Sequence, residues 1–441
     1  MPELRVGDFL SRRKEVVHIE DGQDYRQVTI SLNHGGVRLR GVKPGAEIGT
    51  KRQYLTRAGD FILSRIDARN AAFGIVPDSL DGAVITNDFW SFEIDRDQVD
   101  LDYFYLLSQT DAFLDACVRS STGTTNRQRI QAEFFLDYVF EVPPLADQAR
   151  AVERYQSMRG PLDTITEALD RQAADLDALR QRVLDDAVRG RLTERDPDDE
   201  PAEVLLARVA EEKRRRYEAG EIRKPKTLPP VGEDERPFGV PEGWVWTRVG
   251  EVMSDGPTNG SSPKAVKHET SVRSLTLSAT SSGRFDPDHF KYLDLDLEPD
   301  ADLWLQPGDI LVQRGNSPEF VGIAALFPGP ANSFVYPDLM MRFRVPEPIS
   351  ASYTVLLLQA PSSRRFMLER ASGTSSSMPK INQQTLRLVP FALPPPKEQR
   401  RIVARVDALL ALCDRLADRL AAARADAERL VQTVLADALA A

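Results

Sequence analysis

Apolar and small residues near the C-terminus recur in alternating steps of three and four. The series is Val406, Leu409, Cys413, Leu416, Leu420, Ala423, Ala427, Leu430 and Val434. An earlier stretch keeps the same steps with one polar interruption: Leu162, Ile165, Leu169, Gln172, Leu176, Leu179 and Val183. Such steps form the heptad seam of a coiled coil. The pattern predicts two long helices, and each is the expected partner of the other.

Outside these helices, the pattern predicts short strands and helices. The same series of elements is predicted in each half of the chain. Strand-like alternations include DFILSRI, AAFGIV and WSFEI in the first half, and DILVQR and LMMRFRV in the second. Each half then has a helix-like stretch, LDYFYLLSQTDAFLDACV or SYTVLLLQAPSSRRFMLERA, which leads into a loop rich in Gly, Ser and Thr. The chain therefore reads as two copies of one α+β unit.

Matching segments follow one another in the same order in both halves. Their offset drifts only from 243 residues, for Arg5 against Arg248, to 251 residues, for Pro143 against Pro394. The matches include GDFILSR with GDILVQR, SSTGTTNRQRI with RASGTSSSMPKI, and PPLADQ with PPPKEQ. Collinear repeats indicate a duplicated domain that is followed each time by its own long helix. The predicted segments are a first domain at 1–143, a helix at 144–195, a charged helix and Pro-rich linker at 196–237, a second domain at 238–394 and a second helix at 395–441.

Length and composition agree with a protein of several domains. The chain has 441 residues, of which 41% are hydrophobic, and this is enough for more than one core. No apolar run approaches the length of a membrane span, and the first residues lack a signal-peptide core. Two cysteines, Cys117 and Cys413, make no disulfide framework. A cytoplasmic location without membrane association is expected.

The net charge of −10 does not favour nucleic acid as a partner, but the location of basic groups matters more than their sum. Basic and hydroxyl residues gather at several places, each of which has a solvated surface or a plain turn as its alternative interpretation. In the Gly-Thr loops, small polar residues can bring N–H groups up to a phosphate, and basic residues follow directly after each loop. The candidate DNA-binding residues are Lys51, Arg52, Arg65, Arg69, Arg119, Thr124, Arg127, Arg129, Lys264, Lys267, Arg314, Asn316, Arg364, Arg365, Thr374 and Lys380.

A search for catalytic motifs finds almost nothing. The sequence has no P-loop and no Asn/Asp-Pro-Pro-Tyr/Phe motif of an amino-methyltransferase. Its four histidines have no metal-ligand spacing. Asp60 and Asp309 each follow the repeated Gly; the interpretation as a turn that enters a strand is favoured, with a nuclease centre as the alternative. The residues alone therefore give no motif on which to base a catalytic function.

The combined motifs resemble the specificity subunits of type I restriction-modification systems. The resemblance lies in the Pro-Pro and Gln entry to a long helix after each of two unlike domains. It also lies in three stretches: RGNSPEFVGIAAL from Arg314, FGVPEGWVWTRVGEV from Phe238 and VRGRLTERDPDDEPAEVLLARV from Val188. It covers essentially the whole chain. One departure is that the second helix lacks a counterpart to the Gly190-Arg191-Leu192 ending of the first.

The resemblance implies a non-catalytic recognition subunit that acts in phage defence. Two target-recognition domains would each read half of an asymmetric, bipartite site in double-stranded DNA, and two antiparallel helices would space them. The helices would also dock two modification subunits, which methylate adenine with S-adenosylmethionine. Restriction subunits with ATP-driven translocase and Mg-dependent nuclease activity would join the assembly. No cofactor is expected in this chain itself.

Other functions stay open from the residues alone. The chain could be a DNA-reading adaptor of another phage-defence or methylation system with the same plan. It could instead be a coiled-coil scaffold that binds only protein, which a DNA-binding assay would distinguish. A stand-alone nuclease or methyltransferase is the enzyme alternative, although its motifs are missing.

Overall fold

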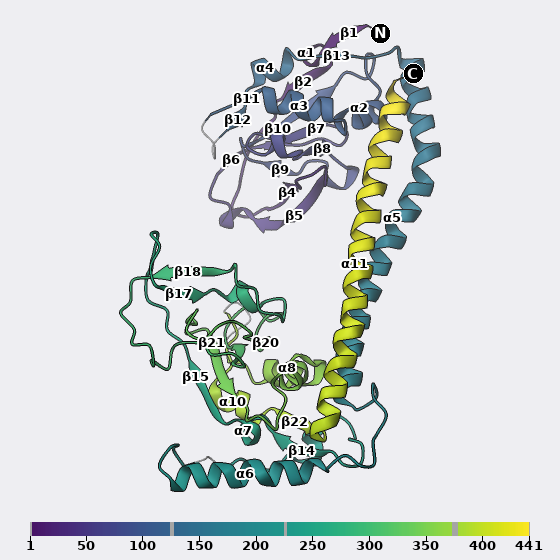
Figure 1. The fold of residues 1–441 in the computed structure, drawn as a ribbon. Helices are drawn as coiled ribbons and strands as arrows, with labels where there is room; N and C mark the ends of the chain where they lie inside the picture. Colours follow the sequence, from purple (N-terminus) through teal and green to yellow (C-terminus); the bar gives the residue numbers. More distant parts are fainter. Residues whose placement is uncertain (1, 124–127, 225–226, 373–377, 441) are drawn as a thin grey trace. The chain divides into compact units, whose positions relative to one another are not determined.

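The protein, seen in a computed structural model, is described for residues 2–123, 128–224, 227–372 and 378–440. It divides into two compact units, residues 1–171 with 421–441 and residues 172–420. Two helices of 44 residues each, α5 (Leu145–Val188) and α11 (Pro396–Leu439), contribute to both units. Both helices are visible in Figure 1.

The domain of the first unit is built on a four-stranded antiparallel sheet with the order β2-β10-β7-β8. Its strands are β2 (Leu10–Arg13), β10 (Phe89–Ile94), β7 (Phe61–Ser64) and β8 (Phe73–Ile75). A second sheet has the order β3-β6-β9-β4-β5, with β3 (Val16–His18), β6 (Arg52–Leu55), β9 (Val84–Ile85), β4 (Asp24–Ile30) and β5 (Val37–Pro44). Two short pairs complete the strands: β1 (Glu3–Arg5) with β13 (Val139–Glu141), and β11 (Ser121–Thr122) with β12 (Arg129–Ile130).

Short helices cover the four-stranded sheet of the first domain and enclose an aromatic core. They are α1 (Val6–Phe9), α2 (Leu101–Ser108), α3 (Asp111–Arg119) and α4 (Ala132–Leu136). Asp100 caps α2 by accepting hydrogen bonds from two backbone N–H groups, and Thr110 caps α3. The rings of Phe61, Phe104 and Phe113 meet edge to face, with centroids 5.0–5.8 Å apart. The predicted single helical stretch before the Gly-Thr loop is thus two capped helices.

The domain of the second unit repeats this plan. Its four-stranded sheet has the order β15-β21-β19-β20, with β15 (Asp255–Asn259), β21 (Met340–Arg344), β19 (Ile310–Gln313) and β20 (Ala324–Leu326). A short pair joins β14 (Val245–Arg248) to β22 (Pro390–Leu393). The helices α7 (Val249–Val252), α8 (Ala351–Gln359), α9 (Pro361–Glu369) and α10 (Gln383–Leu388) correspond in order to α1, α2, α3 and α4. The predicted duplication and the α+β class are confirmed.

The two domains differ in one segment of the chain. It lies between β2 and β7 in the first domain and between β15 and β19 in the second. In the first domain, this segment supplies most of the five-stranded sheet. In the second domain, it forms a three-stranded sheet of β16 (Ala265–Val266), β18 (Phe290–Leu293) and β17 (Val272–Leu275). One framework therefore carries two different inserts.

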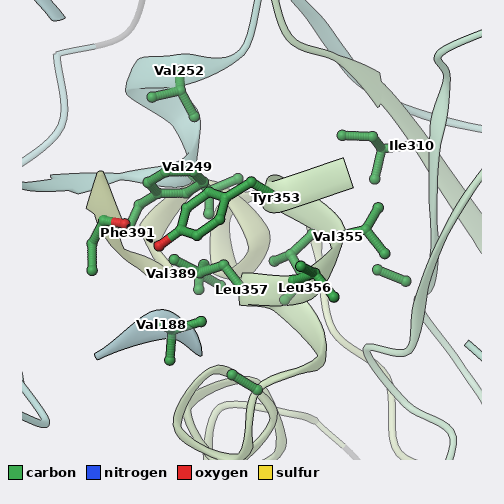
Figure 2. Packing of buried hydrophobic residues seen from close by; sticks show 14 of the residues in the cluster. Val188, Val249, Val252, Ile310, Tyr353, Val355, Leu356, Leu357, Val389 and Phe391 are labelled. Carbon is green, nitrogen blue, oxygen red and sulfur yellow. Dashed lines mark hydrogen bonds between the residues drawn. The ribbon is translucent and has the colours of Figure 1, made fainter. Parts of the chain in front are cut away.

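The core of the second domain includes the ends of both long helices. Val188 of α5 belongs to the same buried cluster as Tyr353, Leu356 and Leu357 of α8, which are labelled in Figure 2. Ile402 and Val406 of α11 belong to the same buried cluster. The hydroxyl group of Tyr353 is fully buried and donates a hydrogen bond to the carbonyl of Ala392 (2.8 Å). Each long helix is therefore anchored in this domain rather than attached to its surface.

The repeated glutamine of the Pro-Pro motifs joins each domain to its helix. Gln148 is fully buried; its carbonyl accepts from the N–H of Asp100 (2.7 Å), and its amide donates to the carbonyls of Pro143 (2.7 Å) and Gln98 (3.0 Å). Gln399 does the same, with the N–H of Ser350 (2.8 Å) and the carbonyl of Pro394 (3.0 Å). Asp100 and Ser350 are the N-caps of equivalent helices, α2 and α8. This joint explains why the motif occurs twice.

The long helices pair in an antiparallel manner within each unit. In the first unit, Arg424 forms an ion pair with Asp170 (3.0 Å); in the second, Arg180 forms one with Asp414 (2.9 Å). Residues spaced by seven face the partner helix. Buried positions of this kind are Leu162, Leu176, Val183, Val406, Cys413 and Ala427, and half-buried ones are Leu169, Leu420 and Val434.

The other half of the predicted seam does not lie between the helices. Ile165 and Leu179 of α5 keep 47% and 44% of their surface exposed, and Leu416 and Leu430 of α11 keep 37% and 48%. In the same series, Leu409 is half-buried against the second domain, and Ala423 is half-buried too. In a complete two-helix coiled coil both heptad positions pack against the partner, whereas here the second position is left largely exposed. The prediction of a complete two-helix seam was wrong for these four residues.

The segment between the two domains is more closely packed than a linker. The charged helix α6 (Ala202–Glu218) buries Ala202, Leu205 and Val209 in the core of the second unit. Further on, the buried guanidinium of Arg248 donates to the carbonyls of Pro229 (3.0 Å) and Pro230 (2.9 Å). The Pro-rich residues after 226 therefore lie against the second domain. No helix in the described part of the chain is long and apolar enough to cross a membrane.

Candidate nucleic-acid interface

The end of β7 brings distant parts of the first domain together. Arg65 follows the strand directly; its N–H donates to the carbonyl of Asp88 (2.8 Å), and its carbonyl accepts from the N–H of Ile130 (2.9 Å). Arg129, next to Ile130, forms an ion pair with the carboxylate of Asp88 (3.4 Å). Arg69 donates to the side-chain carbonyl of Gln128 (2.5 Å). Three predicted residues, Arg65, Arg69 and Arg129, thus meet at one strand end.

A tryptophan holds two arginines at this place. The guanidinium groups of Arg12 and Arg65 lie 4.6 and 4.8 Å from the ring centre of Trp90, within the range of cation–π attraction. Burial, and further the charge of Arg65, lower the pKa of Arg12. The buried Nε atoms of both arginines have no hydrogen-bond partner among the described residues. Because no carboxylate of the described chain pairs with either guanidinium, the cluster carries positive charge that is not compensated within the described residues.

The second domain repeats this framework at the end of β19. The N–H of Arg314 donates to the carbonyl of Leu339, and its carbonyl accepts from the N–H of Ile381, both at 2.8 Å. Lys380 pairs with Gly315 in an isolated β-bridge. The Nε of Arg314 is also buried without a partner in the described chain. Arg314 and Lys380 therefore occupy the places of Arg65 and Arg129.

A polar pocket of 340 Å³ opens beside Arg314. It is lined by Asn259, Arg314, Asn382, Gln383, Gln384 and Arg387. Arg387 donates to the carbonyl of Gly256 (2.6 Å), and Gln383 donates to the side-chain oxygen of Asn259 (3.4 Å). Burial lowers the pKa of Arg387. The lining consists of amides and guanidiniums, with no carboxylate among its residues.

Other predicted residues have different contacts. Lys51 pairs with Asp21 and donates to the carbonyl of Gly45 (2.7 Å), so its charge is largely compensated. Arg119 pairs with Asp115 one turn back (2.8 Å). Arg364 donates to the carbonyl of Glu319 (2.6 Å), and burial lowers its pKa to about 10.

The remaining candidates are less informative. Arg52 lies over the ring of Tyr54 (5.4 Å), and Asn316 donates to Gln313 (2.7 Å) while its own oxygen accepts from Ser317 N–H (2.8 Å). Exposed candidates are Lys264, Lys267 and Arg365. Thr124, Arg127 and Thr374 lie outside the described residues. All these assignments stay predictions.

Sequence reasoning missed Arg12 and Trp90 in the first domain, and Asn259, Gln383, Gln384 and Arg387 in the second. Arg12 lies in a basic run, residues 12–14, but the repeat places no basic residue at the matching position. The amides carry no charge, and Asn259 is far along the chain from Gln383 and Gln384. Only the fold brings them together.

The two repeated aspartates have structural partners. Asp60 is buried and accepts hydrogen bonds from Arg13 (2.7 and 3.1 Å) and Ser91 (2.8 Å). Asp309 is fully buried and accepts from the N–H of Gln306 (2.7 Å) while pairing with Arg344. These contacts agree with the structural role that the sequence favours. No group of three or more His, Cys, Asp or Glu side chains in the described ranges could hold a metal ion.

Comparisons with known proteins agree with the repeated plan. No protein-family model matches the chain. It is 30% identical over 387 residues to the specificity subunit of the type I restriction enzyme EcoEI of Escherichia coli, covering 78% of this chain and 64% of that protein. It is 27% identical over 372 residues to the EcoAI specificity subunit of the same species, covering 73% of this chain and 61% of the relative. The chain thus spans less than two thirds of the length of both relatives.

A solved structure shows the same fold. The study it comes from concerns complex assembly and conformational transition of the type I R-M system. The match has a TM-score of 0.64 at 17% identity and covers 99% of this chain and 97% of the other. The curated relatives supply the family link, and the structural match supplies the architecture of two domains with long helices. The chain is therefore a homologue of the type I restriction enzyme specificity subunits, as its repeated motifs predict.

Proposed function

We propose that the chain is the DNA-recognition subunit of a type I restriction-modification complex. Each domain reads one half of an asymmetric, bipartite site in duplex DNA, and the chain catalyses no reaction itself. The observation that carries this proposal is the equivalent pair Arg65 and Arg314. Each follows the same strand of the repeated plan, and each keeps a buried donor without a partner in the described chain.

The difference between the two domains supports unlike half-sites. The shared framework places a second basic residue on the segment that is hydrogen-bonded to the strand-end arginine. This residue is Arg129 beside Arg65 and Lys380 beside Arg314. Phosphates look alike at every position of a duplex, so residues common to both domains suit phosphate contacts. The unlike inserts, which form most of a five-stranded sheet in one domain and a three-stranded sheet in the other, suit the reading of different bases.

The long helices offer a surface for the modification subunits. Both ion pairs between the helices join residues whose numbers sum to 594. The residue numbers of Ile165 and Leu430 sum to 595, so these two side chains lie at the same height along the helix pair in the first unit. The same holds for Leu179 and Leu416 in the second unit. Heptad geometry points both members of each pair to the same side. A helix of a modification subunit would cover each apolar pair, and two such pairs fit two modification subunits.

The rest of the assembly follows from this role. The modification subunits would methylate adenine with S-adenosylmethionine, and restriction subunits would supply ATP-driven translocation and Mg-dependent cleavage. This chain would bring those activities to the site that it reads. Double-stranded DNA and the partner subunits are the proposed ligands.

Replacing Arg65 or Arg314 by Ala is expected to weaken binding to all duplex sequences alike. Each loss of a phosphate contact should flatten the slope of log affinity against log salt by about 0.9. The measurement is the dissociation constant of the assembled complex on duplex DNA at several salt concentrations. Arg171→Ala removes an exposed arginine of α5 and serves as the control. Unchanged slopes for both variants, with normal folding, would contradict the assignment.

Replacing Leu179 or Leu416 by Lys should prevent docking without unfolding the chain. Both side chains are exposed, so the free energy of unfolding is expected to change by only about 0.5 kcal/mol. A lysine in the centre of an apolar contact should cost about 2 kcal/mol or more of binding energy. The check is the affinity of the purified modification subunit for each variant. Ala178→Lys is the control. It adds the same charge at an exposed position of α5, two residues after the seam residue Leu176, and this variant should bind the modification subunit with normal affinity. Equal affinities for all three variants would exclude this surface.

A further inference from the structure

The repeat makes it possible to separate shared positions from domain-specific ones around the strand-end arginines. Ile130 and Ile381 donate equivalent backbone hydrogen bonds to Arg65 and Arg314. Three residues after this aligned pair of isoleucines, Gln384 corresponds to Glu133. Six residues after it, Arg387 corresponds to Leu136.

The sheet register places Asn259 in the same comparison. In the second domain, Thr258 pairs with Arg342, which pairs on its other side with Leu311 of β19. In the first domain, Arg13 pairs with Ser91, which pairs on its other side with Ile62 of β7. Strands β19 and β7 are equivalent, so Thr258 corresponds to Arg13. Asn259 therefore corresponds to Lys14. Arg314 of the lining is common to both domains, but the amides Asn259, Gln383 and Gln384 have no amide counterpart in the first domain.

The hydrogen-bonding capacity of this lining is largely unused. Gln384 makes no side-chain hydrogen bond within the described chain. Gln383 donates to Asn259, which leaves the amide N–H₂ group of Asn259 without a partner among the described residues. The oxygen of Asn382 accepts from the N–H of Thr385 (2.8 Å), so Asn382 mainly orders the start of α10. The pocket therefore has neutral groups that can both donate and accept.

We infer that Gln384, supported by Asn259 and Gln383, reads an adenine in the half-site of the second domain, while Arg314 beside it holds a phosphate. Asn and Gln side chains recognise adenine by accepting from N6 and donating to N7 in the major groove. A carboxylate can only accept, and it suits the N4 amino group of cytosine. The first domain, which has Glu133 and Ala132 at the matching places, should not read adenine in this way.

This inference rests on the proposed function and has its own test. The complete complex is mixed with duplex DNA of randomised sequence, and the bound molecules are sequenced. For Gln384→Ala we expect the preference for adenine to fall roughly 5- to 150-fold at one position of one half-site. The other half-site and the salt dependence should stay unchanged, because no charge is lost.

Two further variants keep the test independent of folding. Gln384→Glu preserves the shape and copies the residue that the first domain carries at position 133; the preference should move away from adenine. Gln432→Ala removes an exposed glutamine of α11 and should change nothing. If Gln384→Ala kept the wild-type preference, or weakened all sequences alike, the assignment would be overturned. If the wild-type complex selected no sequence at all, the proposed function itself would fail.

Discussion

Exchanging residues 1–142 for the matching domain of a related specificity subunit is expected to replace one half of the methylated site and to leave the other half intact. The first domain has its own sheets and its own aromatic core, separate from the buried cluster of the second. The exchange keeps Pro143 and Gln148, so the joint to α5 is retained. Methylome sequencing of cells that carry the hybrid and the modification subunit measures the outcome directly.

The reciprocal exchange is the matched control for this result. Replacing the second domain, residues 238–393, keeps Pro394 and Gln399 and should change only the opposite half of the site. Two hybrids that each altered a different half would establish one reader per domain. A hybrid that altered both halves, or an active hybrid that altered neither, would contradict the two-reader proposal.

Lengthening both long helices by one heptad should widen the gap between the same two half-sites by about three base pairs. Seven helical residues add about 10 Å, and each base pair of duplex takes about 3.4 Å. The insertions belong between Leu169 and Leu176 in α5 and between Leu420 and Ala427 in α11. Residues of the helix seam whose numbers sum to 596, namely 169 with 427 and 176 with 420, then keep their partners.

The helical turn of DNA limits the strength of this effect. Three base pairs turn the second half-site by roughly a quarter of a turn, so methylation at the longer site should be weaker than normal. An insertion in α5 alone is the control; it shifts one helix against the other and should destabilise the pair without giving a new gap. An active double insertion with the original gap would show that the helices do not determine the spacing.

The repeat made the architecture predictable from the sequence. Collinear motifs gave two copies of one domain, and heptad spacing gave two long helices; both are confirmed. Heptad spacing does not show how many helices share an apolar face, because a seam for two helices and a face for three have the same period. Ile165 and Leu430 were therefore placed between the helices, although each keeps nearly half of its surface exposed.

The candidate site was predictable where it is charged, and most clearly where the charge is repeated. Arg65, Arg129, Arg314 and Lys380 lie in matching motifs, so the comparison of the halves found them. Trp90 and Gln384 belong to one domain each and have no such match. Their relation to the arginines depends on strand pairing and on the packing of α10, which no spacing along the chain expresses.

The joint made by Gln148 and Gln399 has a consequence for how such proteins diversify. Both glutamines bind only main-chain groups of the domain: N–H groups of helix caps and carbonyls of the preceding segment. Main-chain groups are the same whatever side chains the domain carries. A foreign domain acquired by recombination at the Pro-Pro motif would thus find its attachment already complete, provided that its backbone reaches the same cap. The side chains that meet DNA can then change freely, so natural selection can alter the target sequence in one crossover without rebuilding the scaffold.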